Sequence, residues 1–251
     1  MAIDVRGLNF GYRGEDVLRD ITLRAPAGKF IALLGKNGSG KSTLLRLIAG
    51  MLEFRSGFIE ILGQDITRLH RSQRARLIGY LPQFHTPFFP FTVEEVVLTG
   101  RAAYVFSVPS RHDREITDRA MSEVGIEVMR NRPYTELSGG ERHLVMIARV
   151  LAQEPRIILL DEPLSHLDLH NQSRVLDLIR RFTTAGLTVM AVLHDPNTAF
   201  AYADEFLFLK DGSIRTIDAG ANPWDQSVLA DVYGTPLEII PYKGRALVMP
   251  G

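Results

Sequence analysis

The stretch from Gly35 to Thr43, GKNGSGKST, has the residue types and the spacing that phosphate binding requires. Its glycines let the backbone curl until successive N–H groups point inward at phosphate oxygens. An apolar run (30–34, FIALL) precedes the stretch and a helical pattern (44–49, LLRLIA) follows it, so a helix dipole adds positive potential. The predicted phosphate contacts are Gly35, Lys36, Asn37, Gly38, Ser39, Gly40, Lys41, Ser42 and Thr43.

Within this stretch, Lys41 can reach β- and γ-phosphates, and the Ser42 hydroxyl can bind Mg²⁺. The alternative is a Gly/Ser-rich turn that happens to end in Lys-Ser. A chain of this length matches the bare pattern by chance about once in a hundred, and the surrounding strand and helix patterns make chance a poorer explanation. The residues thus predict phosphate binding and leave its use open.

Two adjacent carboxylates, Asp161 and Glu162, follow an apolar run (156–160, RIILL) typical of a strand buried on both faces. Open α/β sheets bind ligands at the carboxyl ends of their strands. We therefore expect Asp161 to hold Mg²⁺ and Glu162 to act as the general base for an attacking water. A polar turn is the alternative.

Two further polar residues end predicted strands. Gln83 follows the strand at 77–81 and could bind Mg²⁺ or water, although an ordinary loop glutamine is the simpler interpretation. His194 ends the strand at 187–193 and could donate a hydrogen bond to a γ-phosphate oxygen. The alternative for His194 is a structural histidine.

The segment LSGGE at 137–141 opens a predicted helix and offers a second anion site at Ser138, Gly139 and Gly140. The alternative is a capped helix start that Glu141 assists. His166 and His170 have helical spacing, but no third ligand is evident, so we predict no metal site there.

The composition of the 251 residues is that of an ordinary globular protein, with 45% hydrophobic and 23% charged residues. Basic and acidic residues balance at 29 each, so no overall charge favours nucleic acid, and we expect no nucleic-acid partner. The absence of cysteine excludes disulfides, cysteine–zinc sites and thiol catalysis. No apolar run approaches the 18 or more residues of a spanning helix, and the N-terminus is unlike a signal peptide. We expect a soluble, cytoplasmic protein.

The elements that must position these residues alternate between strands and helices, which predicts an α/β fold with a mostly parallel sheet. Strands are expected at 2–10, 17–23, 30–34, 58–62, 77–81, 156–161, 187–193, 205–210 and 214–218, and a short basic helix at 68–76. Residues 84–152 are mostly helical in pattern and are predicted to be an insertion into a core formed by 1–83 and 153–251. The tail predicts a helix at 223–232 and strands at 235–241 and 245–249.

Together these motifs resemble the nucleotide-binding subunits of ATP-binding-cassette (ABC) transporters over essentially the whole chain. The matching segments are GKNGSGKST (Walker A), Gln83 (Q-loop), LSGGE (signature), IILLDEP at 157–163 (Walker B), SHLD at 165–168 (D-loop), His194 (switch histidine) and Tyr12, the aromatic residue that stacks on adenine. The resemblance implies an ATPase that uses ATP and Mg²⁺. It implies a P-loop NTPase (RecA-like) core, an N-terminal antiparallel β subdomain and an inserted α-helical subdomain, all in one domain over 1–251.

ATPases of this family work as head-to-tail dimers with ATP between the Walker A of one subunit and the signature of the other. The resemblance therefore implies that Ser138, Gly139, Gly140, Glu141 and Asp168 serve the nucleotide of a second copy. The departures from the family pattern are mild: Glu141 and His143 stand where many relatives have glutamine, Leu164 replaces threonine, and His166 replaces alanine. None of them removes a catalytic group.

Three segments resemble the ATPases of iron-siderophore, haem and vitamin B12 importers: 92–101, 193–214 and 232–241. This resemblance implies a peripheral subunit at the cytoplasmic face of the inner membrane. Its partners would be a permease contacted through 84–105 and, indirectly, a substrate-binding protein. Molybdate or tungstate importers share these features, and an exporter subunit is a further alternative. A DNA-repair or translation ATPase is the rival class, but no coiled-coil heptads and no second cassette are present.

Overall fold

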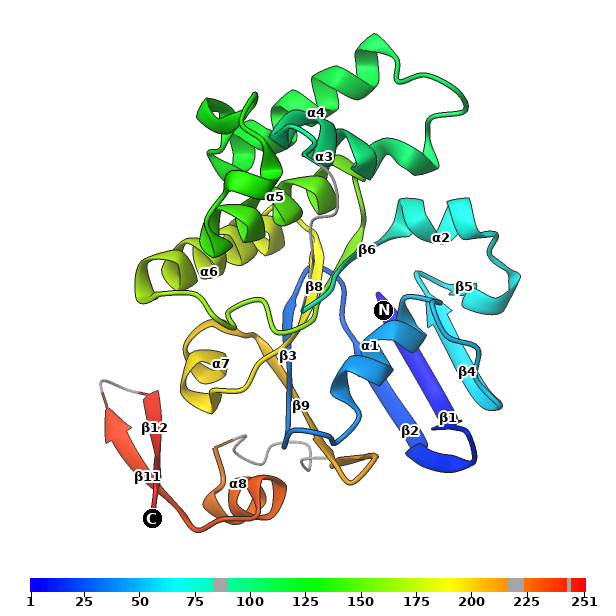
Figure 1. Ribbon diagram of the computed structural model, residues 1–251. Coiled ribbons are helices and arrows are strands. Elements are labelled where there is room, and N and C mark those ends of the chain that lie inside the picture. Colours follow the sequence, from blue (N-terminus) through cyan, green and yellow to red (C-terminus); the bar gives the residue numbers. More distant parts are fainter. Residues whose placement is uncertain (84–89, 216–223, 243–244) are drawn as a thin grey trace.

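The computed structural model describes residues 1–83, 90–215, 224–242 and 245–251 (Figure 1). A six-stranded sheet in the order β10-β9-β3-β8-β7-β6 forms the centre of the fold. Its strands are β3 (Phe30–Leu34), β6 (Ile78–Leu81), β7 (Ile157–Leu160), β8 (Thr188–Val192), β9 (Glu205–Lys210) and β10 (Ser213–Arg215). The strands pair in parallel except for β10, which pairs antiparallel with β9. The predicted α/β fold with a mostly parallel sheet is confirmed.

A second, four-stranded antiparallel sheet has the order β2-β1-β4-β5. Its strands are β1 (Ile3–Tyr12), β2 (Glu15–Ala25), β4 (Ser56–Ile61) and β5 (Gln64–Asp65). The two-residue turn between β1 and β2 is Arg13-Gly14, and both of its residues have positive φ, 46° and 95°. Such a turn matches the twist of the strands that it joins.

The central sheet separates two hydrophobic cores because side chains alternate along each strand. In β3, Ile31 and Leu33 belong to the core shared with helix α1 (Lys41–Ile48) and the antiparallel sheet. Phe30, Ala32 and Leu34 face the opposite core, which includes residues of α3–α8. All four residues of β7 are buried, as predicted for a strand covered on both faces.

Helices cover this second face and extend beyond the sheet edge at β6 (Figure 1). They are α3 (Val93–Leu98), α4 (Arg111–Val124), α5 (Gly139–Ala152), α6 (Leu169–Thr184), α7 (Pro196–Tyr202) and α8 (Gln226–Tyr233). The short helix α2 (Arg71–Leu77) precedes β6, and its last residue packs on the core of α1 and the antiparallel sheet. Short 3₁₀ turns are η1 (Ile66–Arg68), η2 (Thr99–Ala103), η3 (Glu127–Met129) and η4 (Tyr134–Glu136). The tail ends in an antiparallel hairpin of β11 (Leu237–Tyr242) and β12 (Arg245–Pro250).

Capping explains where several helices begin. Thr92 with Glu95, Ser110 with Asp113, and Ser138 with Glu141 each form a reciprocal capping box. The predicted helix at 68–76 was wrong at its start: Asp65 caps η1 and His70 caps α2, so the segment divides into two pieces. Part of the predicted strand at 214–218 and residues 84–89 of the predicted permease contact at 84–105 lie outside the described residues.

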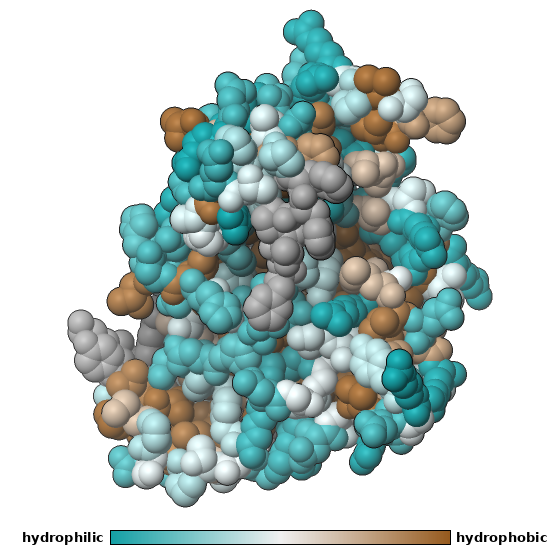
Figure 2. All heavy atoms as spheres, in the orientation of Figure 1, coloured by the Kyte–Doolittle hydropathy of each residue, from teal (hydrophilic) through white to brown (hydrophobic). Residues whose placement is uncertain are grey.

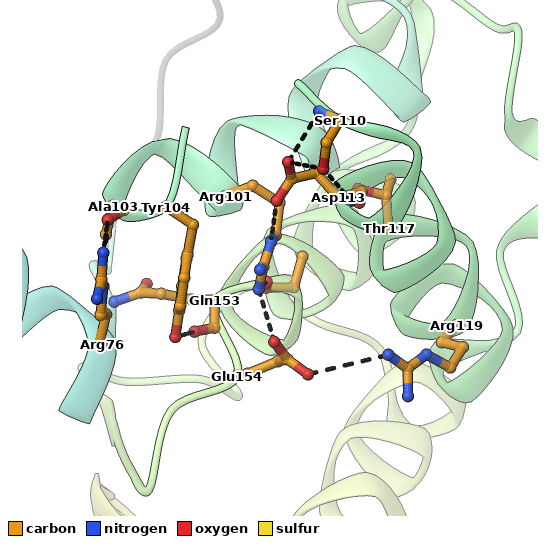
Figure 3. A network of polar contacts seen from close by, with 11 residues as sticks. Arg76, Arg101, Ala103, Tyr104, Ser110, Asp113, Thr117, Arg119, Gln153 and Glu154 are labelled. Carbon is orange, nitrogen blue, oxygen red and sulfur yellow. Dashed lines mark hydrogen bonds and ion pairs between the residues drawn. The ribbon is translucent and has the colours of Figure 1, made fainter. Parts of the chain in front are cut away.

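The buried side chain of Arg101 connects the helices on the far side of β6 (Figure 3). Its guanidinium donates to Asp113 of α4 at 3.0 Å, to the carbonyl of Ala152 at the end of α5 at 2.9 Å, and to Glu154 just after α5 at 2.8 Å. It also lies 3.9 Å from the ring centre of Tyr104. A buried cation with this many acceptors fixes the relative placement of η2, α4 and the end of α5.

Candidate nucleotide site

The candidate site forms at the carboxyl ends of four strands of the central sheet, because β3, β8, β7 and β6 are parallel neighbours. The loop at 35–40 follows β3, His194 follows β8 by one residue, Asp161 and Glu162 follow β7, and Gln83 follows β6. The alternation of strands and helices predicted this convergence, and the pairing of the strands produces it.

The loop between β3 and α1 depends on its glycines. Gly35, Gly38 and Gly40 have φ of 146°, 79° and 104°, a region that favours glycine. A Cβ at Gly35 would also collide with the Leu209 carbonyl oxygen of β9. The loop is thus held close to the sheet and turns sharply into α1, with Gly40 as the helix cap.

Lys41 begins α1 and is only 5% exposed. Its ammonium donates to the carbonyl oxygens of Gly35 at 2.8 Å and Lys36 at 2.6 Å. Burial lowers the pKa of Lys41, against the opposing effect of the charges on Glu162 and Asp161. The loop therefore holds a largely desolvated cation at the start of a helix.

The loop also contains a buried hydroxyl without a partner in the described residues, that of Ser39. A buried polar group normally has a partner. Next to it, the space where a Cβ of Gly38 would lie is open. An unpaired hydroxyl, a buried ammonium and a helix N-terminus fit an anion such as a nucleotide phosphate.

Asp161 is almost fully buried, and both of its carboxylate oxygens accept hydrogen bonds. Oδ1 accepts from the Ser42 hydroxyl at 2.7 Å, and Oδ2 accepts from the Tyr80 hydroxyl at 3.0 Å. Arg46 Nε in turn donates to the Tyr80 oxygen at 3.4 Å. A hydroxyl and a carboxylate at this distance are hard oxygen donors of the kind that Mg²⁺ prefers.

No group of three or more His, Cys, Asp or Glu able to hold a metal is present in 1–83, 90–215, 224–242 and 245–251. Mg²⁺ is usually bound by one or two carboxylates together with water and substrate phosphates. The expectation that His166 and His170 do not build a metal site stays a prediction.

Glu162 has φ of 55°, an uncommon conformation for a residue with a side chain. Its Oε2 accepts from His194 Nε2 at 2.7 Å, from the Ser165 hydroxyl at 2.9 Å and from the Gln83 amide. Burial alone would raise the pKa of Glu162, but the hydrogen bonds from His194 and Ser165 outweigh it, so the pKa lies below its usual value. The carboxylate is thus kept charged and oriented.

Beside these groups is a cavity of about 270 Å³, lined by Glu162, Ser165, His194 and residues after β8. Gln83, Glu162 and His194 are therefore brought together with Ser42 and Asp161 on neighbouring strands. The His194 side chain is 40% exposed. The arrangement offers an oriented base next to a phosphate-shaped loop.

The signature residues 137–141 lie at the start of α5, away from the site described above. Ser138 caps α5 and accepts from the Glu141 amide at 3.3 Å, while Glu141 also pairs with Arg132 at 2.9 Å. Gly140 packs so closely on Asn171 of α6 that a Cβ would lie 2.6 Å from its amide nitrogen. Figure 1 shows α5 far from the turn between β3 and α1. One copy of the chain does not bring the two anion sites together.

Two other predicted residues lie at the margins of the site. Tyr12 ends β1, is 42% exposed and contacts Phe10 edge to face at 4.8 Å. Asp168 caps α6 by accepting from the Asn171 amide at 2.8 Å. Neither contacts the carboxylates in the described structure.

Sequence reasoning missed two site residues, Tyr80 and Ser165. Ser165 follows Glu162 by three residues, a spacing that could have signalled a turn hydrogen bond. Tyr80 lies opposite Leu159 in the pairing of β6 with β7, two positions before Asp161. No local signal in the sequence indicates that pairing.

The family model described as "ABC transporter" matches residues 18–165. The chain belongs to the ABC transporter family. It is 38% identical to the hemin import ATP-binding protein HmuV of Streptomyces coelicolor over 246 residues, which cover 97% of this chain and 88% of that one. The predicted ABC family membership is confirmed, and so is the predicted ATPase activity.

Two solved structures support the same family. An inward-facing metal-chelate type ABC transporter matches with a TM-score of 0.86 and 32% identity, covering 99% of this chain and 96% of the other. The dimeric, post-hydrolysis ABC cassette MJ0796 bound to ADP and phosphate matches with a TM-score of 0.76 and 26% identity, over 88% and 99% of the two chains. The P-loop NTPase fold of ABC ATPases and the binding of ATP follow from these comparisons. In the described part of the chain, no helix has the length and apolarity to span a membrane.

Proposed function

We propose that this ABC ATPase powers the import of a metal chelate, such as an iron-siderophore, haem or cobalamin, through a separate permease. The single observation that carries the proposed chemistry is that the adjacent carboxylates Asp161 and Glu162 have different hydrogen-bond partners. Asp161 is bound to the loop hydroxyl of Ser42, and Glu162 to His194. The similarity to a hemin import protein and to a metal-chelate type transporter supports the class of cargo.

In the proposed site, the loop at 35–43 surrounds the phosphates of ATP, and Lys41 exchanges its loop carbonyls for phosphate oxygens. Tyr12 supplies an exposed ring for the adenine. Ser42 and Asp161 hold Mg²⁺, with Gln83 close by as a ligand or as a contact for water. The metal ion, when bound, neutralises charge that develops on the phosphates.

For hydrolysis, Glu162 takes the proton of the attacking water as general base. Its lowered pKa keeps it unprotonated at neutral pH. The Nε2 proton of His194 would be shared between this carboxylate and a γ-phosphate oxygen. Gln83 donates a hydrogen bond to the same carboxylate, so a displacement of Gln83 would change the position of the general base.

A second copy of the chain completes the site. The start of α5 has an anion-binding helix N-terminus that lies away from its own phosphate loop. In a head-to-tail dimer, Ser138, Gly139, Gly140 and Glu141 would face the ATP of the partner, with Asp168 at the interface. The MJ0796 cassette, a dimer with ADP and phosphate, supports this arrangement.

The permease is proposed to dock on the side of the inserted helical subdomain, residues 84–152. A cavity of about 640 Å³ lies there between the end of α1, α2, β6 and α5, and its lining includes Met51, Arg74 and Arg149. Phe106 and Val108 in the loop before α4 are 104% and 74% exposed. Figure 2 shows apolar surface at the upper right, over that loop. Exposed aromatic and basic residues suit a protein interface.

With the permease docked there, the protein would lie at the cytoplasmic face of the membrane. A substrate-binding protein would deliver the cargo to the permease from the opposite side of the membrane. No nucleic acid is proposed as a partner, because the charges of the chain balance.

The proposal is tested by reconstituting the chain with the permease encoded beside it in vesicles. Uptake of haem, cobalamin, a ferric siderophore and molybdate is measured with and without ATP, with Glu162→Gln as the inactive control. We expect ATP-dependent uptake of one of the chelates. ATP-dependent uptake of molybdate alone, or ATP-driven movement in the export direction, would contradict the proposal.

A further inference from the structure

Asp161 is held from two sides by hydroxyl groups of different origin. Ser42 lies in the first turn of α1, directly after the phosphate loop, whereas Tyr80 lies on β6, the edge strand of the central sheet. The backbone adds a third constraint, because the Asp161 amide donates to the Leu81 carbonyl at 2.9 Å. The side chain of Asp161 therefore accepts from Tyr80 of β6, the same strand to which the Asp161 backbone donates.

The hydrogen bond from Tyr80 occupies the carboxylate oxygen that Ser42 does not contact. Oδ2 accepts from Tyr80, and Oδ1 is left toward Ser42. A serine hydroxyl has one proton and two lone pairs, so Ser42 can donate to Oδ1 and still offer its oxygen to a cation. The contact to Tyr80 thus sets which carboxylate oxygen is presented on the metal side.

The donor role of Tyr80 is secured by its surroundings. A phenol has one proton, and an arginine side chain can only donate, so Tyr80 accepts from Arg46 and donates elsewhere. Arg46 donates to that oxygen at 3.4 Å, which leaves the phenolic proton directed to Asp161. A carboxylate that is 1% exposed loses much of its stabilisation when one such donor is removed.

We infer that Tyr80 is a positioning residue that holds the Asp161 carboxylate in the orientation needed to bind Mg²⁺ beside Ser42. Tyr80 does not touch the nucleotide or the metal in this assignment, and acts through Asp161. The inference rests on the proposed function, since it takes Asp161 and Ser42 as the metal-binding pair.

The test measures metal binding without turnover. With the full chain in excess over ADP, so that all ADP is bound, Mn²⁺ is titrated in and the free ion is followed by electron paramagnetic resonance. We expect Tyr80→Phe to raise the Mn²⁺ dissociation constant about tenfold, because the lost hydrogen bond is to a charged group. ADP affinity in EDTA should stay at the wild-type value.

Two variants separate the hydroxyl from the ring. Tyr104→Phe removes a comparable phenolic hydrogen bond, the one to the Gln153 carbonyl at 3.1 Å, and should leave Mn²⁺ binding unchanged. Tyr80→Met removes the hydroxyl together with the ring and should weaken Mn²⁺ binding as much as Tyr80→Phe does. Weak Mn²⁺ binding in Tyr80→Met with wild-type binding in Tyr80→Phe would show that the ring is needed for packing, and would overturn the inference.

Asp161→Asn distinguishes this inference from the proposed function. We expect it to weaken Mn²⁺ binding at least as strongly as Tyr80→Phe. Wild-type Mn²⁺ affinity in Tyr80→Phe with weakened affinity in Asp161→Asn would overturn the role of Tyr80 and leave the metal pair standing. Wild-type affinity in Asp161→Asn would overturn the metal pair itself.

Discussion

His194 Nε2 lies 2.7 Å from Glu162 Oε2, although the two residues follow different strands of the sheet. The parallel pairing of β7 with β8 brings them together. The contact joins the two groups proposed to act on the water and on the γ-phosphate. It also contributes to the lowered pKa of Glu162, so its loss has consequences that depend on pH.

His194→Ala is expected to shift the acid side of the ATPase pH profile to higher pH. The hydrogen bond from His194 lowers the pKa of Glu162, so its removal raises that pKa, and the carboxylate takes up a proton, and stops acting as a base, at a higher pH. Phosphate release measured between pH 4.5 and 8 checks this.

Ser165→Ala provides the comparison for this experiment. It also removes a hydrogen bond that lowers the pKa of Glu162, so it should shift the acid side in the same direction. Only His194→Ala should also lose rate at pH 8, because only the imidazole is proposed to contact the γ-phosphate. An acid side that does not move in either variant would contradict the role of these contacts.

Lys41→Ala is expected to weaken ATP binding about tenfold or more, because the buried ammonium is proposed to bind phosphate oxygens. Calorimetry with ATP in the absence of Mg²⁺ measures this loss directly. Lys29→Ala is the matched control, since Lys29 is 48% exposed and pairs with Asp204 at 3.7 Å. Equal affinity of Lys41→Ala and wild type for ATP would argue against the phosphate loop.

Arg101→Met is expected to destabilise the fold by about 3–5 kcal/mol, because it leaves the Asp113 carboxylate without its buried cation. Urea unfolding at pH 7 gives the change in the free energy of unfolding. Arg119→Met is the control: its partner Glu154 is 3.9 Å away, its side chain is 64% exposed, and the loss should be below about 1 kcal/mol. Similar losses in both variants would show that the network in Figure 3 is not held by Arg101.

Local chemistry explains what the sequence alone could predict. The loop at 35–43 was found because glycine, lysine and serine at fixed spacing leave few other interpretations. Asp161, Glu162 and His194 were expected at one sheet edge because apolar runs that alternate with helices predict parallel strands. The structure places them on neighbouring strands, and their catalytic roles stay predictions.

Contacts between distant segments explain what could not be predicted. The bonds of Gln83 to Glu162 and of Tyr80 to Asp161 depend on the pairing of β6 with β7, which are more than seventy residues apart. The divided helix at 66–77 depends on two successive caps, Asp65 and His70, and a histidine cap is not among the usual signals.

The measurement that tests the account most directly is ATP turnover by Glu162→Gln. Because a positioned general base contributes about a hundredfold or more, the variant should lose nearly all phosphate release while it still binds ATP. With ATP and Mg²⁺ it should accumulate as a nucleotide-bound dimer in size-exclusion chromatography, and Ser138→Arg added to it should restore the monomer. Wild-type turnover by Glu162→Gln would contradict the account.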